Sequence, residues 1–455
     1  MNSIYLKYKQ YYRDNLVLAL PVVISQLGHT LVQTSDSVII GHFAGTISLA
    51  ASALSSSIFI IFLIIGIGIS YGLTPLIAQH NGRENFDECG KLLSNSLFVN
   101  MVTGVLLFAL TYFCSGYLLD HLKQTPAVVK EAKPFLLLLG ISIVPLLFFN
   151  TFKQFAEGLG FTKQAMLISI WGNILNIVLG VIFVKGLFGI SPMGIKGVGY
   201  STLIDRTVMA IVMSIYIFKS PKFKKYLKDF IISRIDFSRV KAILKIGVPV
   251  AMQYTFEISA FSAAAILIGV IGYHEQAAHQ VAINLASITY MMASGVSAAA
   301  TIKSGNYFGS NEHLKLRHSA ISNYHIVLVF MGFTACMFAI FNHQLPWIYT
   351  SDTIVINIAA HLLILAAFFQ LFDGTQVVGL GILRGMGDVN IPTLITFIAY
   401  WIIGLPVGYL FGIYLHQGVY GVWYGLVLGL IASSLLLFYR FHIISIKNHQ
   451  DSLKS

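Results

Sequence analysis

The sequence predicts an all-α integral membrane protein with about twelve transmembrane helices, in two six-helix repeats that form two lobes around a central cavity. Three observations predict this fold class. Hydrophobic residues make up 56% of the 455 positions and charged residues only 10%, whereas about a quarter of a soluble domain is charged. The mean hydropathy of +0.77 reflects apolar residues along the whole chain. Finally, the two halves of the sequence resemble each other.

Apolar stretches of about 20 residues, which cross about 30 Å of hydrocarbon as a helix, define the expected spans. Their continuous apolarity favours helices over an outer-membrane barrel, whose strands alternate polar and apolar residues. Helices also satisfy their own backbone hydrogen bonds in lipid. The approximate expected spans are residues 16–40, 49–75, 92–118, 134–152, 164–184, 197–218, 243–270, 277–302, 319–341, 355–382, 391–414 and 419–442.

Basic residues predict the orientation of the chain. Most of the 29 Lys and Arg residues fall on the side of the membrane that holds the N-terminus. By the positive-inside rule, both termini are expected to be cytoplasmic, in a multi-pass protein of the plasma (inner) membrane. The densest basic stretch, 219–245, is expected to contact anionic lipid headgroups. The lipid bilayer therefore accounts for the net charge, and no nucleic acid partner is expected.

Internal similarity predicts the duplication. The segment "LALPVVISQ" at 18–26 aligns with "IGVPVAMQY" at 246–254, which sets Pro21 against Pro249. Later motifs align at nearly the same offset, so the chain consists of two six-helix halves in the same orientation. Such repeats are typical of transporters that rock one half against the other. The expected domains are an N-terminal lobe at 1–218, a basic cytoplasmic linker at 219–242 and a C-terminal lobe at 243–455.

Ionisable side chains inside the expected spans are the first candidate functional residues, because each costs several kcal/mol near the bilayer centre. Glu257 and Asp373 lie within apolar spans that contain no basic residue next to them. Buried carboxyl groups without their own cations favour binding of protons or metal ions. We predict that these two form one coupling-cation site, where Na⁺ is the only metal expected. Asp205 and Arg206 are adjacent and opposite in sign, so a structural role is expected, in which they either offset each other or partner neighbouring helices.

A polar stripe on the first expected helix gives a second group of candidates. Its residues recur at spacings of three and four, so they share one face; they are Gln26, His29, Gln33 and Asp36. We predict that Asp36, His29 and Gln33 bind substrate or a proton. Further polar residues expected in the cavity are Gln253, Gln280 and Asn176. Hydrogen bonding between helices is the alternative role for the glutamines.

Enzyme motifs are missing or wrongly spaced. In "HEQAAH" at 274–279 the histidines are five residues apart, about 140° around a helix, which argues against a zinc site. The sequence contains no Walker loop and no Gly-x-Ser-x-Gly motif. We therefore expect no enzymatic activity and no cofactor, only a coupling ion.

Six motifs, taken in order, resemble those of the multidrug and toxic compound extrusion (MATE) family, NorM-like branch. The motifs are "SDSVIIG" at 35–41, "TPLIAQ" at 74–79, "FAEGLG" at 155–160, "AAHQVAIN" at 277–284, "AATIKSG" at 299–305 and "ILRGMGD" at 382–388. The resemblance implies a Na⁺- or H⁺-coupled antiporter that exports organic, mostly cationic compounds. It also implies that the coupling cation binds acidic residues matching Glu257 and Asp373, with another acidic residue matching Asp36.

One position departs from the family pattern. Gly180 stands where other MATE branches carry an aspartate four residues after an asparagine, here Asn176. An ion site built from Asp36 and an aspartate of the fifth helix is therefore in doubt, which favours the C-terminal half for coupling.

Two alternatives remain open at the level of the sequence. Carboxyl groups accept either Na⁺ or H⁺, so the sequence does not choose between them. A lipid-linked precursor flippase of the same broad superfamily is the alternative function, although its cavity would need basic groups for phosphates, and the deep charges here are mainly acidic. We expect organic cations as substrates and a monomeric protein.

Overall fold

The computed structural model describes residues 2–121 and 124–452, and within these ranges every regular element is a helix. Three short π-helical segments, Cys114–Leu118, Ile398–Gly404 and Leu410–Tyr414, continue or join longer helices. The α-helices are α1 (Asn2–Phe43), α2 (Thr46–Ser70), α3 (Leu73–Gly82), α4 (Phe86–Phe113), α5 (Leu119–His121), α6 (Pro126–Gly158), α7 (Thr162–Lys185), α8 (Ile195–Lys219), α9 (Phe237–Ile271), α10 (Tyr273–Gly309), α11 (His313–Ile340), α12 (Thr353–Gly385), α13 (Asn390–Phe397), α14 (Leu405–Tyr409) and α15 (Gly418–Ser452).

Twelve helical stretches of the described chain are long and apolar enough to cross a membrane, which confirms the predicted number. Several of them extend beyond the expected spans. The second stretch, Thr46–Gly82, joins α2 and α3. Helix α6 continues to Gly158, past the predicted end at residue 152, because the polar residues that follow are buried rather than solvated. The expected span covers only the apolar part of this longer helix.

Contacts divide the chain into two compact units, Ile24–Ala251 and a second unit made of Met1–Val23 with Met252–Ser455. The division falls inside α1 and inside α9, in each case two residues after a proline, Pro21 or Pro249. Proline removes one backbone hydrogen bond from a helix and bends it. The division by contacts does not test the predicted repeat boundaries at 218 and 243, which stay a prediction.

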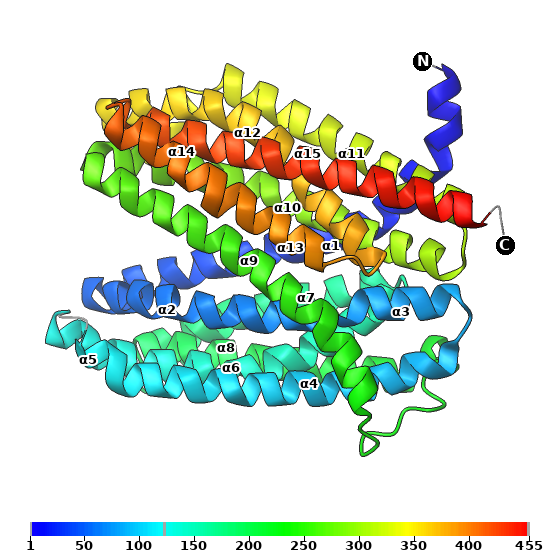
Figure 1. Ribbon diagram of the computed structural model, residues 1–455. Helices are drawn as coiled ribbons and strands as arrows, with labels where there is room; N and C mark the ends of the chain where they lie inside the picture. Colours follow the sequence, from blue (N-terminus) through cyan, green and yellow to red (C-terminus); the bar gives the residue numbers. More distant parts are fainter. Residues whose placement is uncertain (1, 122–123, 453–455) are drawn as a thin grey trace. The chain divides into compact units, whose positions relative to one another are not determined.

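Each unit is built around one long, buried helix (Figure 1). In Ile24–Ala251, α6 packs against α2, α4 and α8. In the other unit, α12 packs against α10, α11 and α15. Both helices carry many buried polar residues among their apolar ones. Their central positions therefore bring polar side chains away from lipid and against neighbouring helices.

The basic segment that follows α8 packs against its own unit. Phe223 and Tyr226 are buried, and the Tyr226 ring meets Phe86 edge-on at 5.1 Å between centroids. Lys91 forms an ion pair with Asp229 at 3.0 Å. The predicted linker is thus basic and also anchored to the first turns of α4 by aromatic and ionic contacts.

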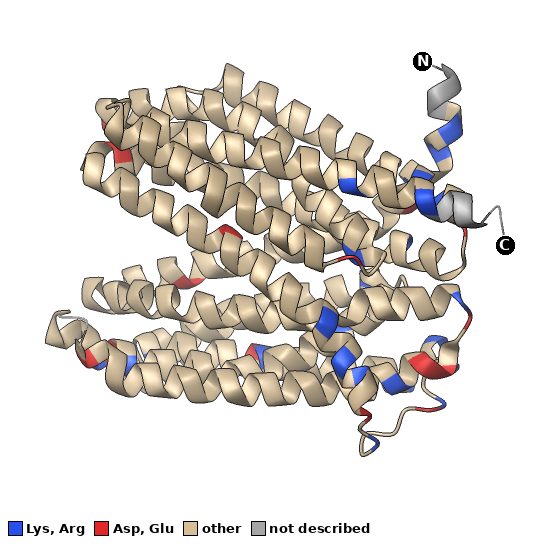
Figure 2. Ribbon diagram, viewed as in Figure 1, with Lys and Arg blue, Asp and Glu red and all other residues tan. Residues whose placement is uncertain are grey.

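Charged residues are concentrated near the ends of the helices (Figure 2). Only a few coloured turns lie in the middle of long helices in either unit. Since a charge in the membrane interior is costly unless it faces protein, water or a partner, these few positions define where to look for a functional site.

Candidate functional site

Two buried carboxyl groups lie near each other in the unit that holds α10 to α15. Glu257 on α9 is 6% exposed and Asp373 on α12 is 3% exposed. Their charges interact with each other. Among the described residues, neither carboxyl group forms an ion pair. The fold therefore brings together the two residues predicted to form a coupling-cation site, and it supplies no cation of its own there.

Neutral polar groups surround this pair. Tyr290 on α10 and Tyr400, in the π-helical segment Ile398–Gly404, both interact electrostatically with the two carboxyl groups. Gln376 Nε2 donates to the Tyr400 hydroxyl at 3.0 Å. Sequence reasoning did not select either tyrosine. A π-helical turn inside an α-helix is often found at functional sites, but the sequence does not reveal it directly.

The glutamines predicted to line the cavity occupy different environments. Gln253 is buried, and its Nε2 atom donates to Thr393 Oγ1 at 3.0 Å and to the Val389 carbonyl at 3.3 Å. Gln280 is exposed on α10 and donates to Asn284 Oδ1 at 3.0 Å. Gln253 thus hydrogen-bonds to a neighbouring segment, which is the alternative role given above for the glutamines. Gln280 instead lies on the surface of its unit.

A second polar cluster lies within Ile24–Ala251. Asp36 on α1 interacts electrostatically with Asp205 and Arg206 on α8. Asn176 on α7 is fully buried, and its Nδ2 atom donates to Thr202 Oγ1 at 3.2 Å. Asp36, predicted as a binding residue, thus shares this cluster with Asn176, which was predicted independently.

His29 and Gln33, the other predicted residues of the first helix, differ in exposure. Gln33 is exposed, whereas His29 is partly buried and interacts electrostatically with Lys153 on α6 and with Arg206. Lys153 is 5% exposed and donates to Ser25 Oγ at 3.4 Å. Sequence reasoning missed Lys153.

The sequence did contain a signal for a buried role of Lys153, because Lys153 lies four residues before Glu157. Residues four apart on a helix are neighbours, and oppositely charged side chains at that spacing attract each other. The Lys153 Nζ atom lies 3.9 Å from Glu157 Oε1, and both side chains are buried. This pair neutralises itself, so it adds little net charge to the cluster around Asp36.

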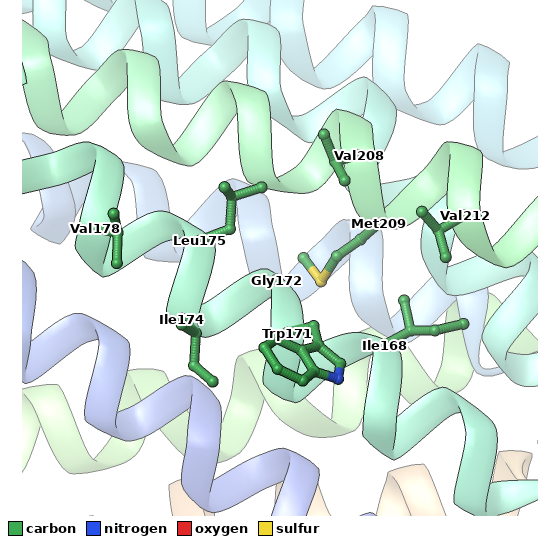
Figure 3. Close-up of a pocket in the computed structure, with 9 residues that line it drawn as sticks. All are labelled: Ile168, Trp171, Gly172, Ile174, Leu175, Val178, Val208, Met209 and Val212. Carbon is green, nitrogen blue, oxygen red and sulfur yellow. The ribbon is translucent and has the colours of Figure 1, made fainter.

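An apolar groove of about 460 Å³ lies between α7 and α8 (Figure 3). Met209 points towards Gly172, and the exposed Trp171 lies along the groove. The residues that line the groove are Ile168, Trp171, Gly172, Ile174, Leu175, Val178, Val208, Met209 and Val212. Because none of these side chains is ionisable, the groove is not a site for the coupling ion.

Twelve apolar helices, two buried polar clusters and a duplicated sequence define an integral membrane protein of the secondary-transporter class. The family model described as MatE matches the chain twice, at residues 21–182 and 249–410, and each match begins at one of the repeat-related prolines. The chain belongs to the MatE family. This confirms the resemblance and the two repeats predicted from the sequence.

Curated relatives match nearly the whole chain. The "Probable multidrug resistance protein NorM" of Xylella fastidiosa (strain 9a5c) is 32% identical over 436 residues, which are 95% of this chain and 92% of that protein. The "Multidrug resistance protein MdtK" of Photorhabdus laumondii is also 32% identical, over 95% of this chain and 96% of that protein. The alignments therefore cover both repeats.

Solved structures show the same fold. A structure described as "MATE in the bent conformation" matches with a TM-score of 0.89 at 21% identity, covering 100% of this chain and 99% of that one. The eukaryotic MATE transporter AtDTX14 matches with a TM-score of 0.88 at 18% identity, covering 98% of this chain and 99% of that one. At these identities the likeness concerns the fold alone.

Proposed function

We propose that this protein is a multidrug efflux antiporter, which exports organic, mostly cationic compounds in exchange for Na⁺ or H⁺. The buried pair Glu257 and Asp373 is the observation that carries the proposal, because two carboxyl groups without an ion pair need a mobile cation when both are ionised. The names of the relatives supply the class of substrate. No enzymatic step and no cofactor other than the coupling ion is required.

The proposed cycle is alternating access. Cation binding neutralises the carboxyl groups and favours one conformation of the protein, and drug binding favours another, so each ligand changes the affinity for the other. A membrane potential of about 100 mV supplies about 2.3 kcal/mol per charge, and one pH unit supplies about 1.4 kcal/mol. Together these sustain roughly a 500-fold drug gradient.

The charges of Ile24–Ala251 support cation transport over a lipid-linked precursor flippase. Lys153 lies 3.9 Å from Glu157, and Arg206 interacts electrostatically with Asp205 and Asp36, so nearby carboxyl groups offset both positive charges and disfavour phosphate. Within this proposal Asp36, His29 and Gln33 contribute to binding of substrate or a proton. The protein acts as a monomer with both termini in the cytoplasm.

Efflux from proteoliposomes tests the proposal. Vesicles loaded with fluorescent ethidium receive either a Na⁺ gradient or a pH gradient, each imposed separately. We expect one of the gradients to accelerate efflux, which identifies the coupling ion. Vesicles without protein serve as the control. Efflux that responds to neither gradient would refute coupled antiport.

Replacement of Asp36 by Asn should weaken efflux of several organic cations by about tenfold or more while the protein stays folded, because an ionisable group inside the span is lost. The matched control is Asp14→Asn, since Asp14 lies on the same helix but faces Lys303, 3.5 Å away. Initial efflux rates and thermal stability in detergent are compared for the two variants. Equal efflux in both would show that Asp36 only holds helices together.

A further inference from the structure

The apolar groove between α7 and α8 lies on the side of α7 that faces away from the interior of its unit (Figure 3). Trp171 on its wall is 69% exposed, and Ile174 is also exposed. Asn173 and Asn176, each two residues further along α7, project about 160° away around the helix and are buried. Both helices are long and apolar enough to cross a membrane. The groove therefore opens towards the hydrocarbon of the bilayer.

The groove is as long as one leaflet of a bilayer. Its residues on α7 run from Ile168 to Val178, which is about 15 Å along the helix at 1.5 Å per residue. The hydrocarbon core is about 30 Å thick, so the acyl chains of one leaflet cover about half of it. Gly172 and Met209 are buried and form the floor of the groove, which is deeper there because Gly172 has no side chain. One acyl chain thus fits along the groove.

One end of the groove leads to basic residues. Helices α7 and α8 follow each other after a short loop and run antiparallel. Gly172, ten residues after the start of α7, packs directly against Met209, ten residues before the end of α8. Lys163 in the first turn of α7 is therefore level with Lys219, the last residue of α8. Lys219 follows Val212 by seven residues, so it lies on the face of α8 that lines the groove.

A third lysine, Lys222, is held beside the start of α7 by aromatic contacts. Its Nζ atom lies 5.7 Å from the centre of the ring of Phe161, the residue just before α7. Phe223 is fully buried, and its ring meets those of Phe161 and Tyr216 at 5.1 and 5.5 Å between centroids. These contacts fix the position of Lys222 between the start of α7 and the end of α8.

The three lysines carry positive charge that nearby acidic groups do not offset. All three are exposed, and none forms an ion pair within residues 2–121 and 124–452. Helix α7 contains no acidic residue, and neither does the stretch 207–228. Lys163 lies about 8 Å from Ile168 along the helix axis. A phosphate group at the lysines is thus within reach of an acyl chain in the groove, and anionic headgroups are what basic residues at a membrane surface attract.

We propose that this protein binds one anionic phospholipid, with an acyl chain in the groove between α7 and α8 and the phosphate headgroup at Lys163, Lys219 and Lys222. The groove alone accepts any alkyl chain, and the lysines alone attract anionic headgroups in general. Together they select an anionic lipid at one position. All residues of this site belong to Ile24–Ala251, and the inference does not depend on the proposed antiport.

Quenching of Trp171 fluorescence by brominated lipid tests the proposal, because Trp171 lines the groove and bromine quenches an indole only at short range. The full-length protein is reconstituted in phosphatidylcholine with a small fraction of phosphatidylglycerol that carries brominated acyl chains. A parallel sample contains brominated phosphatidylcholine instead. The Trp171 signal is the difference between the unaltered protein and its Trp171→Phe variant.

We expect half of the quenching at a fraction of brominated phosphatidylglycerol at least about tenfold lower than that of brominated phosphatidylcholine. Each lysine near an anionic headgroup contributes a factor of about five in affinity. Replacing all three lysines of the site by Gln should make the two lipids equally effective. A matched control replaces three other exposed lysines of the same unit and should keep the preference; its changes are Lys228→Gln, Lys241→Gln and Lys245→Gln.

Filling the groove tests the position of the acyl chain. Val208→Phe together with Val212→Phe adds bulk to its wall without removing a polar group, and should abolish the preference for phosphatidylglycerol. The control is Val102→Phe together with Val105→Phe on α4, where both side chains are exposed in the same unit. That variant should behave like the unaltered protein. Melting temperatures in detergent show which variants are folded.

Equal quenching by the two lipids in the unaltered protein would overturn the proposal. It would also fail if the lysine variant kept its preference, or if the control variant lost as much of it, since the attraction would then be general. If the lysine variant does not fold, the valine variants decide: a preference that survives the filled groove contradicts the site. Efflux that responds to no gradient, with these quenching results intact, would reject the proposed function alone.

Discussion

Replacement of Glu257 by Gln is expected to abolish gradient-driven accumulation of organic cations while drug binding in detergent persists. Gln keeps the shape of the side chain and its hydrogen-bonding capacity but removes the ionisable group. Glu257 is 6% exposed and forms no ion pair in the described structure, and under the proposed coupling its ionisable group is what binds the cation. We expect a loss of at least about tenfold in the drug gradient, measured in proteoliposomes under an imposed Na⁺ or pH gradient.

The matched control is Glu275→Gln, the same chemical change in the first turn of α10, where the acidic side chain lies at a helix N-terminus. It should leave efflux unchanged. Asp373→Asn should resemble Glu257→Gln, and the double variant should lose little more, because groups that act as one site are not additive. A Glu257→Gln protein that still builds a gradient dependent on Na⁺ or H⁺ would contradict the assignment.

The number of helices and their duplication were predictable from the sequence, because lipid imposes the same requirement on every span. Each helix must be apolar for about 20 residues, and each repeat carries its own copy of the motifs. The proximity of Glu257 and Asp373 was also predicted, from two unpaired charges in one repeat. The tyrosines near the two carboxyl groups were not predicted. Tyr400 lies near Glu257 only in the folded chain, because the two residues are far apart in the sequence.

The sequence did not reveal what neighbouring helices provide. Helix α6 continues past the apolar stretch at 134–152 and buries Lys153 and Glu157 within it. The sequence left open whether Asp205 and Arg206 offset each other or partner neighbouring helices. Neighbouring residues on a helix point in different directions, and the Arg206 guanidinium donates to Ser142 Oγ on α6.

Replacement of Gly381 by Leu is expected to disrupt the unit that holds Asp373. A side-chain carbon at this position would overlap the backbone of Ser297, because α12 and α10 approach closely there. The same contact includes two hydrogen bonds, from Ser297 Oγ to the Val377 carbonyl at 2.7 Å and from Thr301 Oγ1 to the Gly381 carbonyl at 2.9 Å. Small residues at such crossings let helix backbones meet in lipid.

A leucine there must push the two helices apart, which costs about 1–3 kcal/mol or more and breaks both hydrogen bonds. We expect a lower melting temperature and a smaller monodisperse fraction in detergent, together with loss of efflux. The control is Gly332→Leu on α11, where an added side-chain carbon would meet nothing within 4 Å. That variant should fold and transport normally. If Gly381→Leu is as stable as Gly332→Leu, close packing of α10 on α12 is not what positions Asp373, and the carboxyl pair must be held by α9 and the segment around Tyr400.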